Sequence, residues 1–166
     1  MIHLVVRYAD SLFGGIDTVG LHKRVVELEG AVWFAKVGAP IGLGRLGRLN
    51  SQVLAGKPSY VYLVQRQERR YAWARGTLIV AQREFPENEK EMVPPYYEHS
   101  GVLRQAATWF KFSDLAKVDG DRCSDLVVAS SSRPIHHALH GSMASMFFVR
   151  SNPNRNLAPI DKSTSP

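Results

Sequence analysis

Two apolar runs joined by a short polar tip are the feature that most limits how this chain can fold. The run SYVYLVQ covers residues 59–65, the tip RQER covers 66–69, and the run RYAWARGTLIVAQ covers 70–82. Segments rich in β-branched and aromatic residues on both sides of a polar tip are typical of a β-hairpin. We therefore expect a sheet in which these two strands are antiparallel neighbours.

The other periodic segments predict further strands and a few helices. Continuous apolar runs predict strands, and apolar residues recurring every three to seven positions before a glycine predict a helix. Besides the hairpin, the expected strands cover residues 2–9, 31–37, 107–115 and 146–150, and the expected helices cover 16–28 and 133–145, with a short helix or irregular turn over 43–56. About six strands, two or three helices and antiparallel connections predict an α+β fold with a curved sheet or open β-barrel.

The length of 166 residues predicts one domain. A chain of this size buries about two-thirds of the surface that it exposes when unfolded, so it needs no disulfide or metal for stability. We expect the domain to cover residues 1–150, with an acidic, proline-rich surface loop over 84–101. Residues 151–166, SNPNRNLAPIDKSTSP, have no apolar periodicity and are expected to form a linker or disordered tail.

The single cysteine and the lack of a long apolar run favour a cytoplasmic protein. Cys123 is the one cysteine of the chain, so it cannot form an internal bridge, and we expect it to be a buried side chain. No apolar run approaches the roughly 20 residues of a membrane span, and the first residues become charged too soon for a signal peptide.

Basic residues outnumber acidic ones in this chain. The sequence has 21 Lys and Arg against 15 Asp and Glu, which gives a formal net charge of +6. This balance favours a polyanionic partner such as a nucleic acid, and a solvated basic surface is the alternative explanation.

No catalytic, cofactor or metal motif is convincing. The sequence has no G-x-S-x-G, P-loop or H-E-x-x-H motif. GLGRLG (42–47) has the G-x-G-x-x-G spacing but lacks the βα unit and acidic residue of a dinucleotide site, so a flexible basic loop explains it better. His136 and His140 offer two ligands and not a complete metal site, and turn chemistry explains Asp119 and Asp121. We therefore expect no cofactor and no metal.

Aromatic residues and arginines are interleaved along the chain. Trp33, Tyr96 and Tyr97 lie next to loops, whereas Trp73 and Trp109 lie in the middle of predicted strands. Aromatic side chains can stack an extruded base while arginines hold the phosphates. For Trp73 and Trp109 a core position is favoured, and for Trp33 core and pocket are equally favoured, because small residues follow it.

The order of these elements resembles the PUA-like superfamily, and within it the EVE and YTH branches. The segment GAVWF (30–34) is similar to the G-V-W-S segment of YTH domains, and AWARG (72–76) is similar to their G-F-A-R-L strand. The resemblance implies that Trp33 forms one wall of a cage for a methylated base, with Phe34 in place of the YTH serine. It also implies that Asp10 contacts the base edge.

The resemblance implies a binding role and not catalysis by this chain. The second cage tryptophan of YTH domains has no counterpart, and Tyr96 or Tyr97 would substitute for it; Trp73 is a further pocket candidate. The arginines expected to hold the nucleic-acid backbone are Arg45, Arg48, Arg66, Arg69, Arg70 and Arg133.

EVE-like domains are similar to the specificity domains of McrB-type modification-dependent restriction systems. We therefore expect a non-catalytic domain that binds methylated DNA by base flipping, reading N6-methyladenine first and 5-methylcytosine second. The alternatives are an RNA reader, a protein-interaction module, and an amide-hydrolysing enzyme of ASCH type that would use Lys36, Tyr62 and Glu84.

Overall fold

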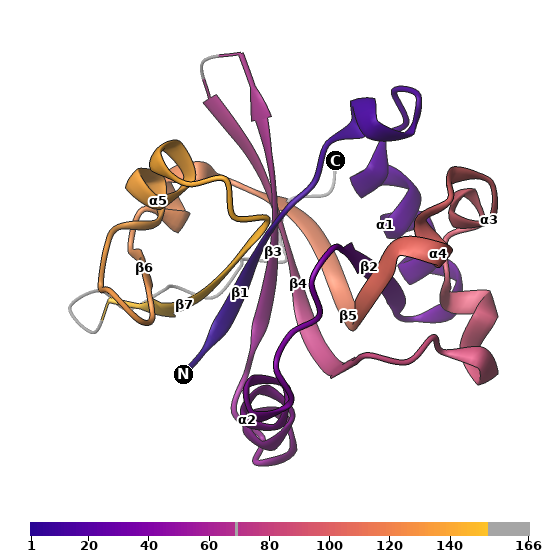
Figure 1. Cartoon of the computed structure of the whole chain (residues 1–166), viewed down its shortest axis with the longest axis horizontal. Coiled ribbons are helices and arrows are strands. Elements are labelled where there is room, and N and C mark those ends of the chain that lie inside the picture. The colour runs from indigo at the N-terminus through magenta and orange to yellow at the C-terminus, as the bar shows by residue number, and fades with distance from the viewer. Residues whose placement is uncertain (69, 153–166) are drawn as a thin grey trace, which may run out of the picture.

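The computed structural model describes residues 1–68 and 70–152, which form one curved sheet with helices around it (Figure 1). Within these residues the sheet has seven strands in the order β2-β5-β4-β3-β1-β7-β6. The strands are β1 (His3–Arg7), β2 (Val32–Val37), β3 (Tyr60–Gln67), β4 (Arg70–Gln82), β5 (Ala106–Val118), β6 (Leu126–Val128) and β7 (Met146–Ser151). The predicted α+β class is confirmed.

Three longer helices and several short ones pack around the sheet. The α-helices are α1 (Thr18–Glu29), α2 (Leu43–Leu54), α3 (Tyr96–Ser100), α4 (Val102–Gln105) and α5 (Ile135–Gly141), and the 3-10 helices are η1 (Asp10–Phe13), η2 (Glu87–Met92) and η3 (Gly120–Cys123). The predicted count of two or three helices is therefore too low for the described residues. The reason is local, because the five additional helices have only four to six residues and no long apolar periodicity.

The residues at the two ends of α1 explain where this helix begins and ends. The Asp17 side chain accepts a hydrogen bond from the Gly20 N–H at 2.9 Å, which satisfies a free donor of the first turn. Gly30 ends the helix in the left-handed region, with φ of 79°. α2 is a regular 12-residue helix, which confirms the helix alternative for residues 43–56. The GLGRLG segment is therefore mostly helical, and the flexible basic loop offered to explain its glycine spacing is wrong.

The hairpin is confirmed, but the connections are not all antiparallel. β3 pairs with β4 in antiparallel register from Tyr60↔Thr77 to Gln67↔Arg70. β1 pairs in parallel with β3, which corrects the antiparallel prediction. The connection from β1 to β3 includes α1, β2 and α2, so it is long enough for the crossover that a parallel pair needs. β2 lies at the far edge of the sheet beside β5.

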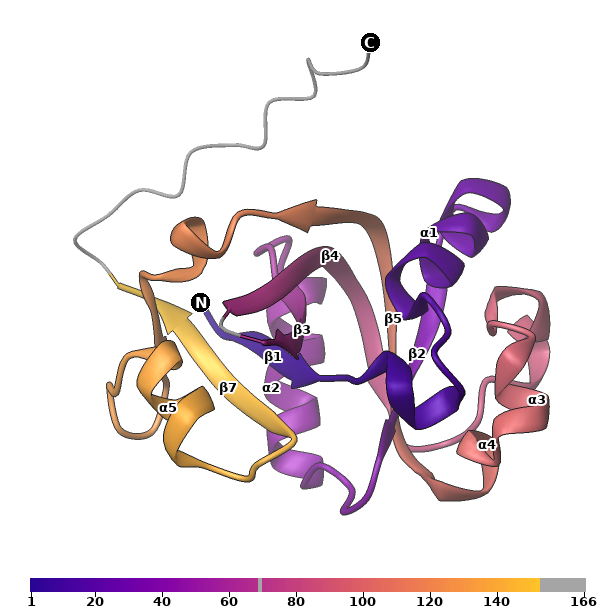
Figure 2. The same ribbon diagram turned by 90° about the horizontal axis from the view of Figure 1, so that it is seen from above.

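Three buried clusters stabilise the part of the chain that the structure describes. α1 and α2 cover one side of the sheet over Leu4 and Val6, and α5 covers Val5 on the other side. Alternate residues of β1 point to opposite faces, which explains why neighbours in sequence belong to different clusters. A third cluster lies where α3, α4 and η2 pack on β2 and β5, and it includes Trp33 and Trp109. Figure 2 shows α5 at one end of the molecule and α3 with α4 at the other end.

The C-terminal end of the described chain and the single cysteine are both held in the folded domain. β7 continues to Ser151, and the Asn152 N–H donates to the Asp125 carbonyl at 3.0 Å; the rest of the predicted tail, 153–166, lies outside the described residues. Cys123 is buried as predicted, and burial raises the pKa of its thiol to about 12. None of the described helices combines the length and apolarity that crossing a membrane would require.

Candidate functional site

A cleft of about 650 Å³ opens at the C-terminal end of β1, between the β3–β4 hairpin and the start of α1. Its walls come from the β1–α1 connection, the half of the hairpin next to its turn, the end of β5 with η3, and α5. The side chains around it are Tyr8, Asp10, Asp17, Val19, Gln67, Arg70, Tyr71, Ala72, Trp73, Ala74, Lys117, Val118, Asp119, Asp121 and His136. A cavity of this size is in the range that holds a small ligand.

Asp10 is a fixed acceptor in this cleft. Its Oδ1 accepts the Thr18 N–H at 3.0 Å, and its Oδ2 accepts the Gln65 side-chain amide at 3.1 Å. The Asp10 N–H donates in return to Gln65 Oε1 at 2.6 Å. A carboxylate has about four acceptor positions, so each oxygen can still accept a hydrogen bond from a ligand. The geometry therefore presents a rigid negative acceptor at the end of β1.

Two tyrosines, Tyr8 and Tyr71, line the same cleft. Tyr8 is half-buried, and burial, with help from Asp10 and Asp17, raises the pKa of its hydroxyl to about 12. Tyr71 is half-buried and its hydroxyl donates to the Leu139 carbonyl at 3.3 Å. Tyr8 therefore stays a neutral donor, and the two tyrosines offer partly open ring surface.

Trp73 contributes to the floor of the cleft and is mostly core. Its side chain is 4% exposed and meets Tyr62 edge to face at 6.4 Å between ring centroids. A Cβ at Gly120 would lie 3.2 Å from Trp73 Cδ1, so the glycine allows η3 to approach the indole closely. The mid-strand core position predicted for Trp73 agrees with this burial.

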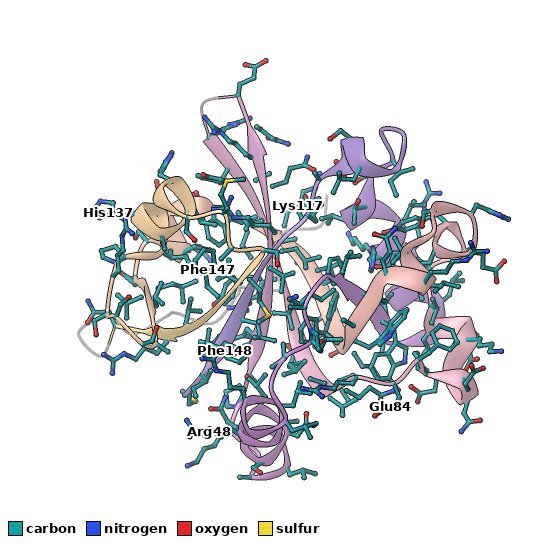
Figure 3. The ribbon with its side chains drawn as sticks, in the orientation of Figure 1. Arg48, Glu84, Lys117, His137, Phe147 and Phe148 are labelled. Carbon is teal, nitrogen blue, oxygen red and sulfur yellow. The ribbon has the colours of Figure 1, made fainter. Side chains whose placement is uncertain are left out.

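The charges of the cleft are mixed. Arg70 and Lys117 are exposed, and Figure 3 shows Lys117 beside the hairpin strands. Asp119 caps η3 by accepting the Asp121 N–H at 3.1 Å, which is the predicted turn chemistry. Cations that can pair with phosphates therefore lie next to carboxylates that can accept hydrogen bonds from amino groups.

Trp33 does not line this cleft. Its side chain is 2% exposed in the cluster under η2 and α3, and its indole N–H donates to Glu89 Oε2 at 2.8 Å. Lys111 donates to Glu89 Oε1 at 2.6 Å, and this hydrogen bond holds the pKa of the Glu89 carboxyl below its ordinary value. η2 thus covers the edge of Trp33, and of its two predicted positions the structure has the core one. Phe34, its neighbour, is 5% exposed in the α1–α2 cluster.

The two predicted tyrosines belong to α3 and pack against α1. Tyr97 is 2% exposed, accepts the Ala35 N–H at 3.2 Å and lies 3.1 Å from His22 Nε2. His22 Nδ1 donates to the Thr18 carbonyl at 2.7 Å, so Nε2 is the acceptor for the Tyr97 hydroxyl. Tyr96 is half-buried beside Tyr97, at 4.6 Å between ring centroids. Of the six predicted pocket residues, Asp10 and Trp73 are among those that line the cleft.

The predicted arginines are separated in the structure. Arg70 lines the cleft, and Arg66 is exposed on the same hairpin. Arg45 and Arg48 lie on α2, and Arg133 precedes α5 with its guanidinium beside Gly141. Arg69 lies outside the described residues. One continuous backbone track through all of them is therefore not seen in the described part of the chain.

The three residues that the amide-hydrolysing alternative would use do not line the cleft. The Lys36 ammonium donates to the Ala39 carbonyl at 2.8 Å, Tyr62 is 3% exposed in the cluster under α5, and Glu84 is exposed after β4. In residues 1–68 and 70–152 no group of three or more His, Cys, Asp or Glu side chains is arranged to hold a metal ion.

Sequence reasoning missed Tyr8 and Lys117. Tyr8 follows β1 directly and lies two residues before Asp10, so its closeness to Asp10 in the sequence was a usable signal. Lys117 carries no such signal, because its position depends on the register Ala74↔Lys117 between β4 and β5.

One comparison identifies the family. The sequence matches the family model described as Pua-like over residues 4–145, which includes all residues that line the cleft. No curated protein matches the chain. With a curved seven-stranded sheet and a match over most of its length, the chain belongs to the Pua-like family.

Proposed function

We propose that this protein is a non-catalytic nucleic-acid-binding module that takes one extruded base into the cleft at the end of β1. The observation that carries the proposal is the fixed Asp10 carboxylate beside the neutral Tyr8 hydroxyl, in a cleft with cations at its edge. Membership of the Pua-like family and the net charge of +6 support a nucleic acid as the partner.

The cleft has the groups that reading a base edge requires. Extruding a base costs a few kcal/mol, which stacking and hydrogen bonds in the pocket must recover. The half-buried rings of Tyr8 and Tyr71 offer stacking surface, and Asp10 can accept the N–H of an exocyclic amine. N6-methyladenine keeps one such N–H, and its methyl group adds about 0.8 kcal/mol of apolar contact when buried.

The phosphates would be held by cations at the edge of the cleft. Arg70 and Lys117 are exposed there, and Arg66 lies on the same hairpin. We propose that this hairpin fills the space that the extruded base leaves in a duplex. We propose methylated duplex DNA as the substrate, with N6-methyladenine first and 5-methylcytosine second, and the specificity step of a modification-dependent restriction system as the role.

The test is a titration at one near-physiological salt concentration. Three matched duplexes are compared: unmodified, with N6-methyladenine, and with 5-methylcytosine. We expect tighter binding to the N6-methyladenine duplex. Asp10→Asn should remove this preference, because it replaces an acceptor oxygen with a donor, so that the base is no longer held in the cleft where its methyl group is buried. Asp114→Asn on the exposed part of β5 is the matched control.

Other results would redirect the proposal. Equal and strongly salt-dependent binding to the three duplexes would contradict base reading and leave a basic surface. Tighter binding to single-stranded RNA of the same sequence would favour the RNA alternative. Peptide binding with weak salt dependence would favour a protein-interaction module.

A further inference from the structure

A second groove lies between α2 and β7, away from the cleft. A hollow of about 350 Å³ is lined by Arg45 and Arg48 from α2, Met146 and Phe148 from β7, and Ile2 before β1. Figure 3 shows Arg48 on α2 and Phe148 on β7 on either side of it. A neighbouring hollow of about 260 Å³ shares Arg45, Met146 and Phe148, so the groove continues along β7.

The groove combines positive charge with an aromatic ring. The Arg45 guanidinium carbon lies over the Phe148 ring, 5.2 Å from its centroid. Arg45 and Arg48 are exposed, and neither has a carboxylate partner among the residues that the structure describes. The linings of the two hollows contain no acidic side chain in that part of the chain, whereas the cleft contains four aspartates.

This pattern favours a ligand that is both planar and anionic. A guanidinium that already covers a phenyl ring can be met on its outer side by a second planar group. Two cations without carboxylate partners can pair with phosphates, and apolar walls such as Met146 and Ile2 disfavour a small hydrated anion. Nucleotides combine a planar base with a phosphate.

We infer that the groove between α2 and β7 binds an unpaired stretch of nucleic acid, with a base stacked on the Arg45–Phe148 pair and a neighbouring phosphate on Arg48. An unpaired strand is required because bases in a duplex already stack on each other. The groove is separate from the cleft: Ile2 and Tyr8 mark the two ends of β1, about 20 Å apart. Binding there goes beyond the proposed reading of one modified base.

The experiment measures binding of labelled, unmodified oligothymidine and oligouridine to the whole protein over a range of salt concentrations. The double variant Arg45→Ala/Arg48→Ala should lower the affinity at least tenfold and reduce the slope of log K against log salt by about 0.7, because one phosphate pairs with Arg48. Arg24→Ala, an exposed arginine on α1, is the matched control and should cause a much smaller change. The oligothymidine and oligouridine arms show whether the strand is DNA or RNA.

Two further variants separate stacking from charge. Arg45→Lys keeps the charge and removes the planar group, and Phe148→Leu keeps an apolar side chain against the core. Each should weaken single-strand binding about fivefold or more. The preference for a modified duplex should stay unchanged in both, so failure here is distinct from failure of the cleft proposal. If the double variant bound the single strands as tightly as Arg24→Ala does, the groove would not be the binding site. Unchanged single-strand affinity in Arg45→Lys and Phe148→Leu would refute base stacking on the Arg45–Phe148 pair.

Discussion

Acidification should destabilise this fold through His22. The side chain is fully buried between α1, β2 and α3, and burial lowers its pKa from 6.5 to about 4. The folded protein therefore keeps His22 uncharged down to about pH 4, whereas the unfolded chain protonates it near pH 6.5. Since the unfolded state binds more protons between these values, stability falls as the pH decreases from about 6.5 to about 4.

The size of the effect follows from the two pKa values. A histidine whose pKa is about 4 in the folded protein and 6.5 in the unfolded chain lowers the free energy of unfolding by about 2 kcal/mol when the pH decreases from 7 to 5. His3 is also buried, with its pKa lowered to about 4, and it adds a similar amount. Protonated His22 would also have two N–H donors, so Nε2 could no longer accept from Tyr97.

Urea unfolding at pH 7 and pH 5 measures this prediction. The stability difference between the two pH values should be about 2 kcal/mol smaller in His22→Gln than in the unchanged protein, because Gln does not titrate. His3→Gln is the parallel control for the second histidine. The same pH dependence in the protein with and without His22 would refute the reasoning, whatever the absolute stability of the variant.

Three further predictions concern packing and helix propensity. Gly76→Ala should cost about 1–3 kcal/mol in urea unfolding, because its Cβ would lie 2.5 Å from Cδ2 of the buried Phe112; an unchanged midpoint would show that this ring can move. Gly44→Ala with Gly47→Ala should raise the free energy of unfolding by up to about 1 kcal/mol for each, and with it the melting temperature, since both new methyl groups meet open space; a lower melting temperature would contradict this. Trp33→Ala should lower the free energy of unfolding by about 3–5 kcal/mol. A variant of unchanged stability that loses only the base preference would show that Trp33 belongs to the base pocket and not to the core.

Local patterns in the sequence predicted most of the secondary structure. The hairpin, α1 and β2 agree with the structure to within about two residues, because alternation, capping and glycine stops act within one element. The parallel pairing of β1 with β3 was not predictable in this way. It depends on β2 pairing with the distant β5, and no local signal records which strands become neighbours.

The candidate site was predicted in part. Asp10, Trp73 and Arg70 line the cleft, but the pattern next to Trp33 was equally consistent with core and pocket. Trp33 is in the core because η2 covers it and Glu89 of η2 accepts the indole N–H of Trp33. That contact joins residues 56 positions apart, and the acidic segment carrying Glu89 predicts only a surface loop.

The sequence by itself determined that this protein has a basic, mixed α and β domain with a hairpin and an aromatic-rich set of strands. These properties follow from composition and from periodicities of two and 3.6 residues, which need no knowledge of distant neighbours. Only the tertiary structure decided that Tyr8, Asp10 and Lys117 share a cleft, that Trp33 is covered, and that Arg45 lies over Phe148. Each of these results depends on strand order and on which helix covers which face, because burial and proximity are properties of the packed chain and not of its segments.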